Sequence, residues 1–266
     1  MNIRSLAFRT DLALHRLAGA EVEDRGDHLV VRTPQNPGYR WGNFHLLAGP
    51  PARDEVDDVL ARYDADFPDS AHRTFGVDGT DSQRDRLEPL LARGLRFDGA
   101  TVMTATSVHP PPRPNSEATY RRLASDEDWT QKVEVSIVVD DGEDDPVAHR
   151  EYAVRRATAE RSLCESGHAA WWGAFVDDRL ATTMGLVDAG DGLARYQNVE
   201  THPDHRGRGL AGTLVHRVAS FGFDELGART LVMVADPDYR AIRIYRSVGF
   251  ADTETQTQLE QRDRRS

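Results

Sequence analysis

Apolar positions recur along the chain at two spacings: every second residue in short segments, and every third or fourth residue in longer ones. The first spacing is typical of strands and the second of amphipathic helices. In the helix expected from Leu210, for example, Leu214, Val218 and Phe221 fall on one face. The pattern predicts strands at 29–31, 41–47, 73–75, 100–107, 120–123, 169–175, 180–187 and 196–201. It predicts further helices at 54–63, 82–93, 126–135 and 148–166, so we expect an α/β (α+β) protein.

A proline-rich segment separates two groups of these elements. Four of the residues from His109 to Asn115 are prolines, which favour an extended chain and cannot sustain a helix or a central strand. We therefore predict a first domain at 1–108, a linker at 109–117 and a second domain at 118–266. A chain of 266 residues, 39% of them hydrophobic, is long enough to bury a core in each domain.

Glycines and arginines fill the turn between the strand at 196–201 and the helix that follows. The turn, called the cradle below, reads Arg206-Gly207-Arg208-Gly209-Leu210-Ala211. Glycines let a ligand approach the backbone, and the first amides of a helix point outward with the positive end of its dipole. A phosphate or pyrophosphate suits such a turn. The chain has no Gly-Lys-Ser/Thr of a nucleoside triphosphate loop, and the cradle lacks the GxGxxG spacing of a dinucleotide fold.

The pattern Arg-x-x-Gly-x-Ala in the cradle resembles the acyl-CoA signature of the GNAT acetyltransferase superfamily. A second segment, from Asp236 to Phe250, resembles the GNAT pattern Asn-x-x-Ala-x-x-x-Tyr-x-x-x-Gly-Phe in order and spacing. Asp238 stands where the family usually has Asn, and we expect it to cap a helix. Tyr245 is then expected in the third turn of that helix, and Gly249 just after its end.

The resemblance implies a mixed sheet flanked by helices, and a binding site for acetyl-CoA as cosubstrate. In such a site the cradle amides, from Gly207 to Ala211, would hold the pyrophosphate. Backbone groups around Val199 and Thr201 would pair with pantetheine. Asp238 and Tyr245 would complete the site, with Tyr245 near the sulfur as general acid. From the residues alone, Tyr245 could equally be a packed aromatic of a short helix.

The first half ends much as the second does, because Arg93 to Phe97 resembles Arg246 to Phe250. The turn equivalent to the cradle, however, reads Gly49-Pro50-Pro51-Ala52 and lacks the signature. We interpret the first half as a degenerate GNAT-like repeat without a cradle, so that the chain holds two tandem GNAT-like domains. An unrelated α+β domain is the alternative.

Acetyl transfer to an amine also needs a group that keeps the nucleophile neutral. Asn198 and Glu200 alternate onto one face of the strand at 196–201, opposite Val199 and Thr201. Asn198 cannot accept a proton, whereas Glu200 can, directly or through a water. Glu200 is therefore the candidate base, and a solvated or paired strand carboxylate is the alternative. We expect direct transfer, with no covalent enzyme intermediate.

Other reactive side chains are interpreted as structural. His202 and His205 lie on one turn without a third placed ligand, so no metal site is predicted there. Cys164 is the only cysteine and is interpreted as a small hydrophobe on a helix. The acidic run at 140–145 lacks the spacing of a calcium loop. By the resemblance, this run would border the acceptor pocket and attract a cationic amine.

Charge and composition narrow the partners. A formal net charge of −11 argues against a nucleic-acid surface, and no apolar run has the length of a membrane span or of a secretory signal. We expect a cytoplasmic N-acetyltransferase that acts on a small amine or an exposed amino group. Whether the protein forms a homodimer is left open by the sequence. The alternative is a non-catalytic acyl-CoA-binding regulatory module. The tandem arrangement also resembles mycothiol synthase-like proteins, which leaves a larger acceptor open.

Overall fold

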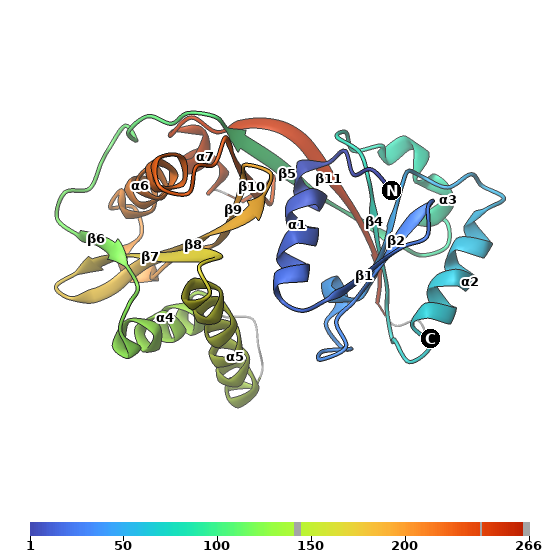
Figure 1. The fold of residues 1–266 in the computed structure, drawn as a ribbon, viewed down its shortest axis with the longest axis horizontal. Helices are drawn as coiled ribbons and strands as arrows, with labels where there is room; N and C mark the ends of the chain where they lie inside the picture. Colours follow the sequence, from blue (N-terminus) through green and yellow to red (C-terminus); the bar gives the residue numbers. More distant parts are fainter. Residues whose placement is uncertain (141–144, 240, 263–266) are drawn as a thin grey trace. The chain divides into compact units, whose positions relative to one another are not determined.

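The computed structural model describes residues 1–140, 145–239 and 241–262, and the chain forms two compact units (Figure 1). The first unit comprises Met1–Met103, Val234–Tyr239 and Asp252–Ser266, and the second comprises Thr104–Met233 and Arg240–Ala251. The units therefore interleave in sequence, since the end of the chain clusters with the first unit. The domain boundaries drawn at the linker stay a prediction.

The first unit is a mixed sheet with helices on both faces. Its strands are ordered β1-β2-β3-β4-β11-β5. β3 and β4 are parallel and are connected by α2, whereas β1–β2, β2–β3 and β4–β11 are antiparallel pairs. The elements are α1 (Leu6–Leu17), β1 (Glu21–Asp24), β2 (His28–Arg32), η1 (Arg40–Gly42), β3 (Phe44–Leu47), α2 (Val56–Asp66), β4 (Arg73–Val77), η2 (Arg84–Arg86), α3 (Glu88–Leu91), β5 (Arg96–Ala105) and β11 (Ala251–Gln261).

Alternation along β2 and β3 divides the core of the first unit into two layers. Side chains at successive strand positions point to opposite faces of a sheet. One layer packs against α1 and comprises Phe8, Leu12, Leu29, Val31, Phe44 and Leu46. The other packs against α2 and α3 and includes Val30, Leu47, Val59, Tyr63, Phe75 and Leu90. Both faces of this sheet are therefore covered.

The second unit is a five-stranded sheet in the order β10-β9-β8-β7-β6. β10 and β9 are parallel, and the other neighbours are antiparallel. Helices α4 and α5 lie on one face, and α6 and α7 on the other (Figure 1). The elements are β6 (Thr119–Arg122), α4 (Asp126–Val139), α5 (Pro146–Glu165), β7 (Ala169–Val176), β8 (Arg179–Gly190), β9 (Leu193–Thr201), η3 (Pro203–His205), α6 (Leu210–Asp224), β10 (Thr230–Ala235) and α7 (Ile242–Arg246).

Local sequence explains where the helices of the second unit begin. Ser125 caps α4 in a capping box with Asp128. Asp145 caps α5 by accepting from the amides of Val147 and Ala148. The predicted stripe of α6 is confirmed, because the apolar residues that define it are all buried: Leu210, Leu214, Val218 and Phe221. This burial fixes α6 against the sheet and so fixes the position of the cradle.

Several predicted elements differ from those observed. Helix α1 and strand β10 were not predicted, and 41–47 divides into η1 and β3. The helix predicted at 82–93 is reduced to η2 and α3, because Gln83 has a left-handed backbone (φ 44°) and Pro89 interrupts the run. In the described part of the chain, no helix is long and apolar enough to cross a membrane.

Candidate active site

Strand β9 separates from β10 after a short parallel stretch. The register joins Leu193–Arg195 of β9 to Thr230–Val232 of β10, and β9 then continues to Thr201. Along that continuation the described strand pairing is with β8. The other edge of β9, at Val199 and Thr201, therefore offers backbone groups to a ligand in extended conformation.

A bulge distorts β9 within the same stretch. Gln197 lies opposite Gly185 and Glu200 opposite Thr183, so Asn198 and Val199 together face Met184. Asn198 has a left-handed backbone with φ of 48°. Bulges redirect side chains and backbone groups, and they occur next to active sites. The bulge also brings Asn198 to the α5 side of the sheet, where its amide nitrogen Nδ2 donates to Glu160 Oε1 at 2.9 Å.

The cradle presents an uninterrupted row of backbone donors. Gly207 and Gly209 have φ of 76° and 77°, and Gly209 is the N-cap of α6. Among the described residues, the amides from Gly207 to Gly212 have no hydrogen-bond acceptor. Unpaired amides at the positive end of a 15-residue helix form a site for an anion. The backbone thus fits the pyrophosphate of an acyl-CoA.

The two cradle arginines are already partly engaged. Arg206 Nε donates to the carbonyl of Thr201 at 3.2 Å, which links the cradle to the end of β9. Arg208 contacts His205 Nδ1 at 3.1 Å and Glu117 at 3.0 Å. Both arginines are exposed, so their charges stay near a ligand on the amides.

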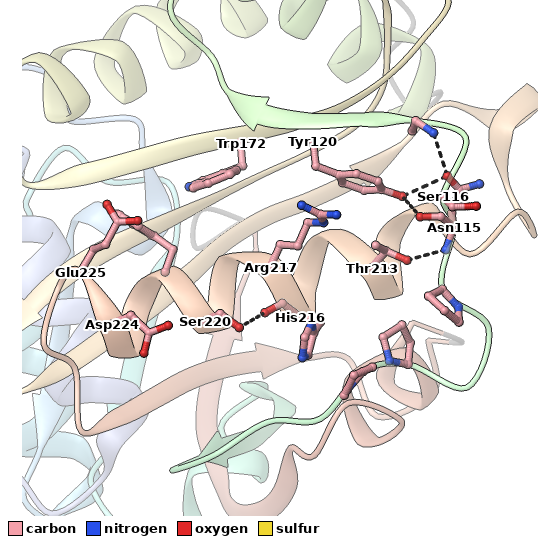
Figure 2. A pocket seen from close by; sticks show the side chains of 15 residues that line it. Asn115, Ser116, Tyr120, Trp172, Thr213, His216, Arg217, Ser220, Asp224 and Glu225 are labelled. Carbon is pink, nitrogen blue, oxygen red and sulfur yellow. Dashed lines mark hydrogen bonds between the residues drawn. The ribbon is translucent and has the colours of Figure 1, made fainter.

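The proline-rich linker forms one wall of the cradle, which the sequence did not indicate. The amide of Asn115 donates to Thr213 Oγ1 at 2.8 Å (Figure 2). The side chain of Asn115 donates to the carbonyl of Arg208 at 3.1 Å. A Cβ added at Gly209 would lie 2.5 Å from the carbonyl oxygen of Arg113. A Cβ at Gly207 would meet nothing within 4 Å. The cradle is therefore closed beside Gly209 and open beside Gly207.

A pocket of about 620 Å³ lies between this linker, β6 and the exposed side of α6. Figure 2 shows Tyr120 and Trp172 facing Arg217 of α6, whose guanidinium lies 4.8 Å from the centre of the Tyr120 ring. Burial raises the pKa of Tyr120, while Thr213 and Arg217 oppose that rise. No residue of the cradle lines this pocket, so the pocket is distinct from the cradle.

Tyr245 is buried in α7, but the helix differs from the expected one. Helix α7 begins at Ile242 with Ala241 as N-cap, so Tyr245 lies in its first turn and not its third. The prediction that Asp238 caps this helix is wrong. Asp238 lies in an earlier turn, where its amide donates to Asp236 Oδ1 at 2.8 Å. Asp236 and Pro237 belong to that turn, and α7 therefore begins later in the sequence than predicted.

Two tyrosines of the second unit interact. Burial raises the pKa of Tyr196 well above its ordinary value, and the nearby Tyr245 contributes to the rise. The Tyr196 hydroxyl donates to the carbonyl of Val215 in α6 at 2.9 Å, and its ring packs edge-on against Phe250. Tyr196 therefore remains a neutral phenol, and its hydrogen bond joins β9 to α6. The sequence analysis did not single it out.

Glu200 is buried and fully engaged. Its Oε2 accepts from Ser136 of α4 at 2.7 Å, and its Oε1 accepts from Arg156 of α5 at 2.9 Å. Burial alone would lower the pKa of Arg156, but the carboxylates of Glu200 and Glu160 outweigh it and raise that pKa. The structure thus places Glu200 near the bulge, in an ion pair.

The ion pair extends into a buried network that the sequence analysis missed. Arg156 Nε donates to Glu160 at 3.0 Å, and Glu160 also pairs with Lys132, which is fully buried. Glu160 is the residue that accepts from Asn198 in the bulge. The positive charges of Lys132 and Arg156 therefore balance the negative charges of Glu160 and Glu200. Together these side chains join α4, α5 and β9. The spacing of Arg156 and Glu160, four residues apart on a helix, was the available signal.

The remaining candidates have structural contacts. His202 Nδ1 accepts from the amide of Asp204 at 3.3 Å, so it shapes the turn before the cradle. Cys164 is half-buried on α5, and burial raises the pKa of its thiol to about 11. Of the acidic run at 140–145, residues 141–144 lie outside the described residues.

The bulged strand, the separating parallel pair and the helix with unpaired amides together suit an extended ligand that carries phosphate groups. A sequence model of the Acetyltransferase (GNAT) family matches residues 110–250, and the chain belongs to this family. The predicted family and fold class are confirmed. The protein is an N-acetyltransferase, and its cosubstrate is acetyl-CoA.

Solved structures share the fold over nearly the whole chain. A functionally unknown conserved protein from Staphylococcus epidermidis has a TM-score of 0.70 at 12% identity, covering 91% of this chain and 93% of that one. A GCN5-related N-acetyltransferase from Kribbella flavida has a TM-score of 0.68 at 17% identity, covering 96% of each. A tandem GNAT protein from the clavulanic acid biosynthesis pathway has a TM-score of 0.58 at 16% identity, covering 97% and 88%. No curated protein matches the chain.

Proposed function

We propose that this protein transfers the acetyl group of acetyl-CoA directly to the amino group of a small-molecule amine, or to an exposed amino group. The observation that carries the proposal is the row of unpaired amides from Gly207 to Gly212, next to the free edge of β9. We place the catalytic site in the second predicted domain, 118–266, and treat the linker as part of its wall.

In the proposed complex, the amides from Gly207 to Ala211 hold the pyrophosphate of the cosubstrate. Arg206 and Arg208 add positive charge at the rim. The backbone of Val199 and Thr201 hydrogen-bonds the pantetheine arm and aligns the thioester with the bulge. Asp238 is left out of this set, because its amide is taken by Asp236 and its exposed carboxylate would repel phosphate.

The chemistry forms a carbon–nitrogen bond and breaks the carbon–sulfur bond of the thioester. The attacking amine loses a proton, and the departing thiolate gains one. We assign delivery of the second proton to the Tyr245 phenol. Its burial, which excludes bulk water, and its position beside the neutral phenol of Tyr196 support this role.

The contacts of Glu200 favour a positioning role over that of the base. Accepting a proton would neutralise the carboxylate of Glu200 and so weaken its ion pair with Arg156 and its hydrogen bond with Ser136. We propose that Glu200 holds Arg156, and through Glu160 the bulge at Asn198. Proton removal from the amine then falls to water. Glu200 acting as base through such a water is the alternative.

We propose further that the first predicted domain, 1–108, binds no acetyl-CoA. Its β3-α2-β4 unit has the parallel arrangement of β9-α6-β10. The turn after β3 contains Pro50 and Pro51, which have no amide hydrogen to donate. This turn therefore lacks the row of donors that the cradle has.

Calorimetry and an acetyl-transfer assay test these proposals separately. Titration of the full chain with acetyl-CoA should give one site per chain, because prolines interrupt the row of donors in the turn after β3. Two sites would contradict the role given to the first half. Release of CoA thiol should then depend on an amine from a panel of polyamines, amino sugars and amino-terminal peptides. Binding of acetyl-CoA without amine-dependent release across the panel would contradict the proposed acceptor class.

A further inference from the structure

Three side chains of metal-binding type meet in the first unit, far from the chemistry of the cradle in sequence. His45 pairs with Val30 across β2 and β3, so His28, two residues before Val30, points to the same face of the sheet. Asp66 is the last residue of α2, which covers that face. One ligating atom from each of His28, His45 and Asp66 lies within 4.8 Å of the others.

One ring nitrogen of His28 is buried without a hydrogen-bond partner in the described part of the chain. Its side chain is 4% exposed, and its Nε2 has no hydrogen-bond partner among the described residues. Its Nδ1 lies 2.6 Å from Asp27 Oδ1. Since a carboxylate only accepts, Nδ1 carries a hydrogen, and in the neutral imidazole Nε2 then presents a lone pair. Arg62 in turn holds the other oxygen of Asp27 at 2.7 Å. Imidazoles that bind metals are oriented by carboxylates in this way.

His45 and Asp66 are neighbours, and because a carboxylate only accepts, His45 Nε2 carries a hydrogen that a change of tautomer would have to move before this nitrogen binds a metal ion. His45 is 1% exposed, and its Nε2 lies 2.9 Å from Asp66 Oδ2. Arg25 and Arg32 hold Oδ1 of Asp66 at 2.9 and 2.7 Å, with a longer contact of 3.2 Å from Arg25 to Oδ2. The arginines thus orient the carboxylate so that Oδ2 faces His45. A hydrogen bond alone would explain this pair, but it leaves the buried Nε2 of His28 unexplained.

We propose that His28, His45 and Asp66 form a binding site for a divalent transition-metal ion, with Zn²⁺ as the preferred cation. Two imidazoles and one carboxylate are ligands of the type that Zn²⁺ prefers, and a water would complete the tetrahedron. With Zn–N bonds of about 2.0 Å, ligand atoms stand roughly 3.3 Å apart. The ligand atoms of His28, His45 and Asp66 are at most 4.8 Å apart. The widest of these separations has to shorten by at most about 1.5 Å, and rotation of the imidazole rings supplies this movement.

The charges around the site can accommodate a cation. Arg25 and Arg32 are both paired with Glu23 as well as with Asp66, and Asp27 is paired with Arg62. The bound ion would join β2, β3 and the end of α2, and so stabilise the first unit. The proposal stands apart from acetyl transfer, because none of its residues belongs to the cradle or to the second unit.

The test uses the full chain without a polyhistidine tag, stripped of metal and titrated with Zn²⁺ against a chromophoric chelator. We expect one site per chain, and a rise in Tm of about 5–10 °C at a free Zn²⁺ concentration near 100 times Kd. Asp27→Asn, at an exposed supporting residue, should weaken Zn²⁺ binding by about 10–100-fold. His28→Gln, which removes a ligand, should weaken it at least as much.

The matched control is the double variant His202→Ala/His205→Ala, which removes two neighbouring histidines from the turn before the cradle. It should bind Zn²⁺ with the stoichiometry and affinity of the wild type. Loss of binding in this control would move the site to the turn before the cradle and overturn the proposal. Absence of Zn²⁺ binding by the folded wild type, or equal affinity in Asp27→Asn and the wild type, would overturn it too. Asp27→Asn keeps the test valid if His28→Gln fails to fold.

Discussion

Replacing Gly207 with leucine should disable acetyl-CoA binding while leaving the protein folded. Gly207 is exposed, and a Cβ there would meet nothing within 4 Å, so the side chain enters open space beside the row of amides. That space is where the proposed pyrophosphate lies. Gly209 is a poorer position for this test. A side chain at Gly209 would collide with the carbonyl of Arg113 even without a ligand.

The expected size of the effect follows from backbone strain and from lost hydrogen bonds. Gly207 has a φ of 76°, and a non-glycine residue in the left-handed region costs about 1–2 kcal/mol of folding free energy. Hydrogen bonds to a charged group are worth about 1.5–3 kcal/mol each. Loss of two amide contacts to the pyrophosphate is therefore worth at least about 3 kcal/mol. The affinity for acetyl-CoA should fall by at least about 100-fold.

Gly167→Leu is the matched control, because Gly167 has a φ of 79°, lies exposed in the turn after α5, and also has nothing within 4 Å of an added Cβ. Both variants should lose the same amount of thermal stability, about 2–8 °C in Tm. Calorimetry should show wild-type acetyl-CoA affinity in Gly167→Leu alone. Undiminished affinity in folded Gly207→Leu would refute the assignment of the cradle.

The other predictions concern the chemistry and one thiol. Tyr245→Phe should lower turnover at saturating acetyl-CoA by at least about tenfold with little change in cosubstrate affinity, and equal turnover in steady-state kinetics would remove the phenol from the mechanism. Glu200→Gln should lower kcat/KM by a similar factor at every pH and cost about 1–3 kcal/mol of stability in denaturant titration, whereas a base would show a changed pH profile. Cys164 should react with iodoacetamide at pH 8 about 100-fold more slowly in the native than in the unfolded protein, because its pKa is raised to about 11. On raising the pH, the Cys164 thiol loses its proton in the unfolded chain before it does so in the native protein. The free energy of unfolding should therefore decrease above about pH 9.

Features that depend on neighbouring residues could be predicted from the sequence. The two glycines and the stripe from Leu210 specify a strand, a turn and a helix within a short stretch, and β9 and α6 lie where expected. Spacing likewise placed Tyr245 on a helix near the end of the second half. The helical turn that holds Tyr245 was predicted wrongly, because the chain at Asp236 forms a separate turn before the helix begins.

Features made by distant partners could not be predicted. The linker was interpreted as a spacer, but Asn115 hydrogen-bonds Thr213, almost a hundred residues later. Glu200 was predicted as the base, with a solvated or paired carboxylate as the alternative, but its partner Arg156 could not be named, because it comes from a helix 44 residues earlier. Neither contact leaves a periodic or spaced pattern in the sequence. Burial of the charged Lys132 could not be predicted either, because the carboxylate that stabilises it, Glu160, comes from another helix.

The pairing of β11 with β4 sets an order on synthesis of the chain. Arg73 of β4 lies opposite Gln261 of β11, so the first unit takes an interior strand from residues that are made after those of the second unit. A growing chain emerges from the ribosome N-terminus first. The first 103 residues therefore wait, with the edge of β4 unpaired, until the second unit has been translated. An exposed strand edge is prone to pair with other chains, which makes this interval the period of greatest risk of aggregation for the protein.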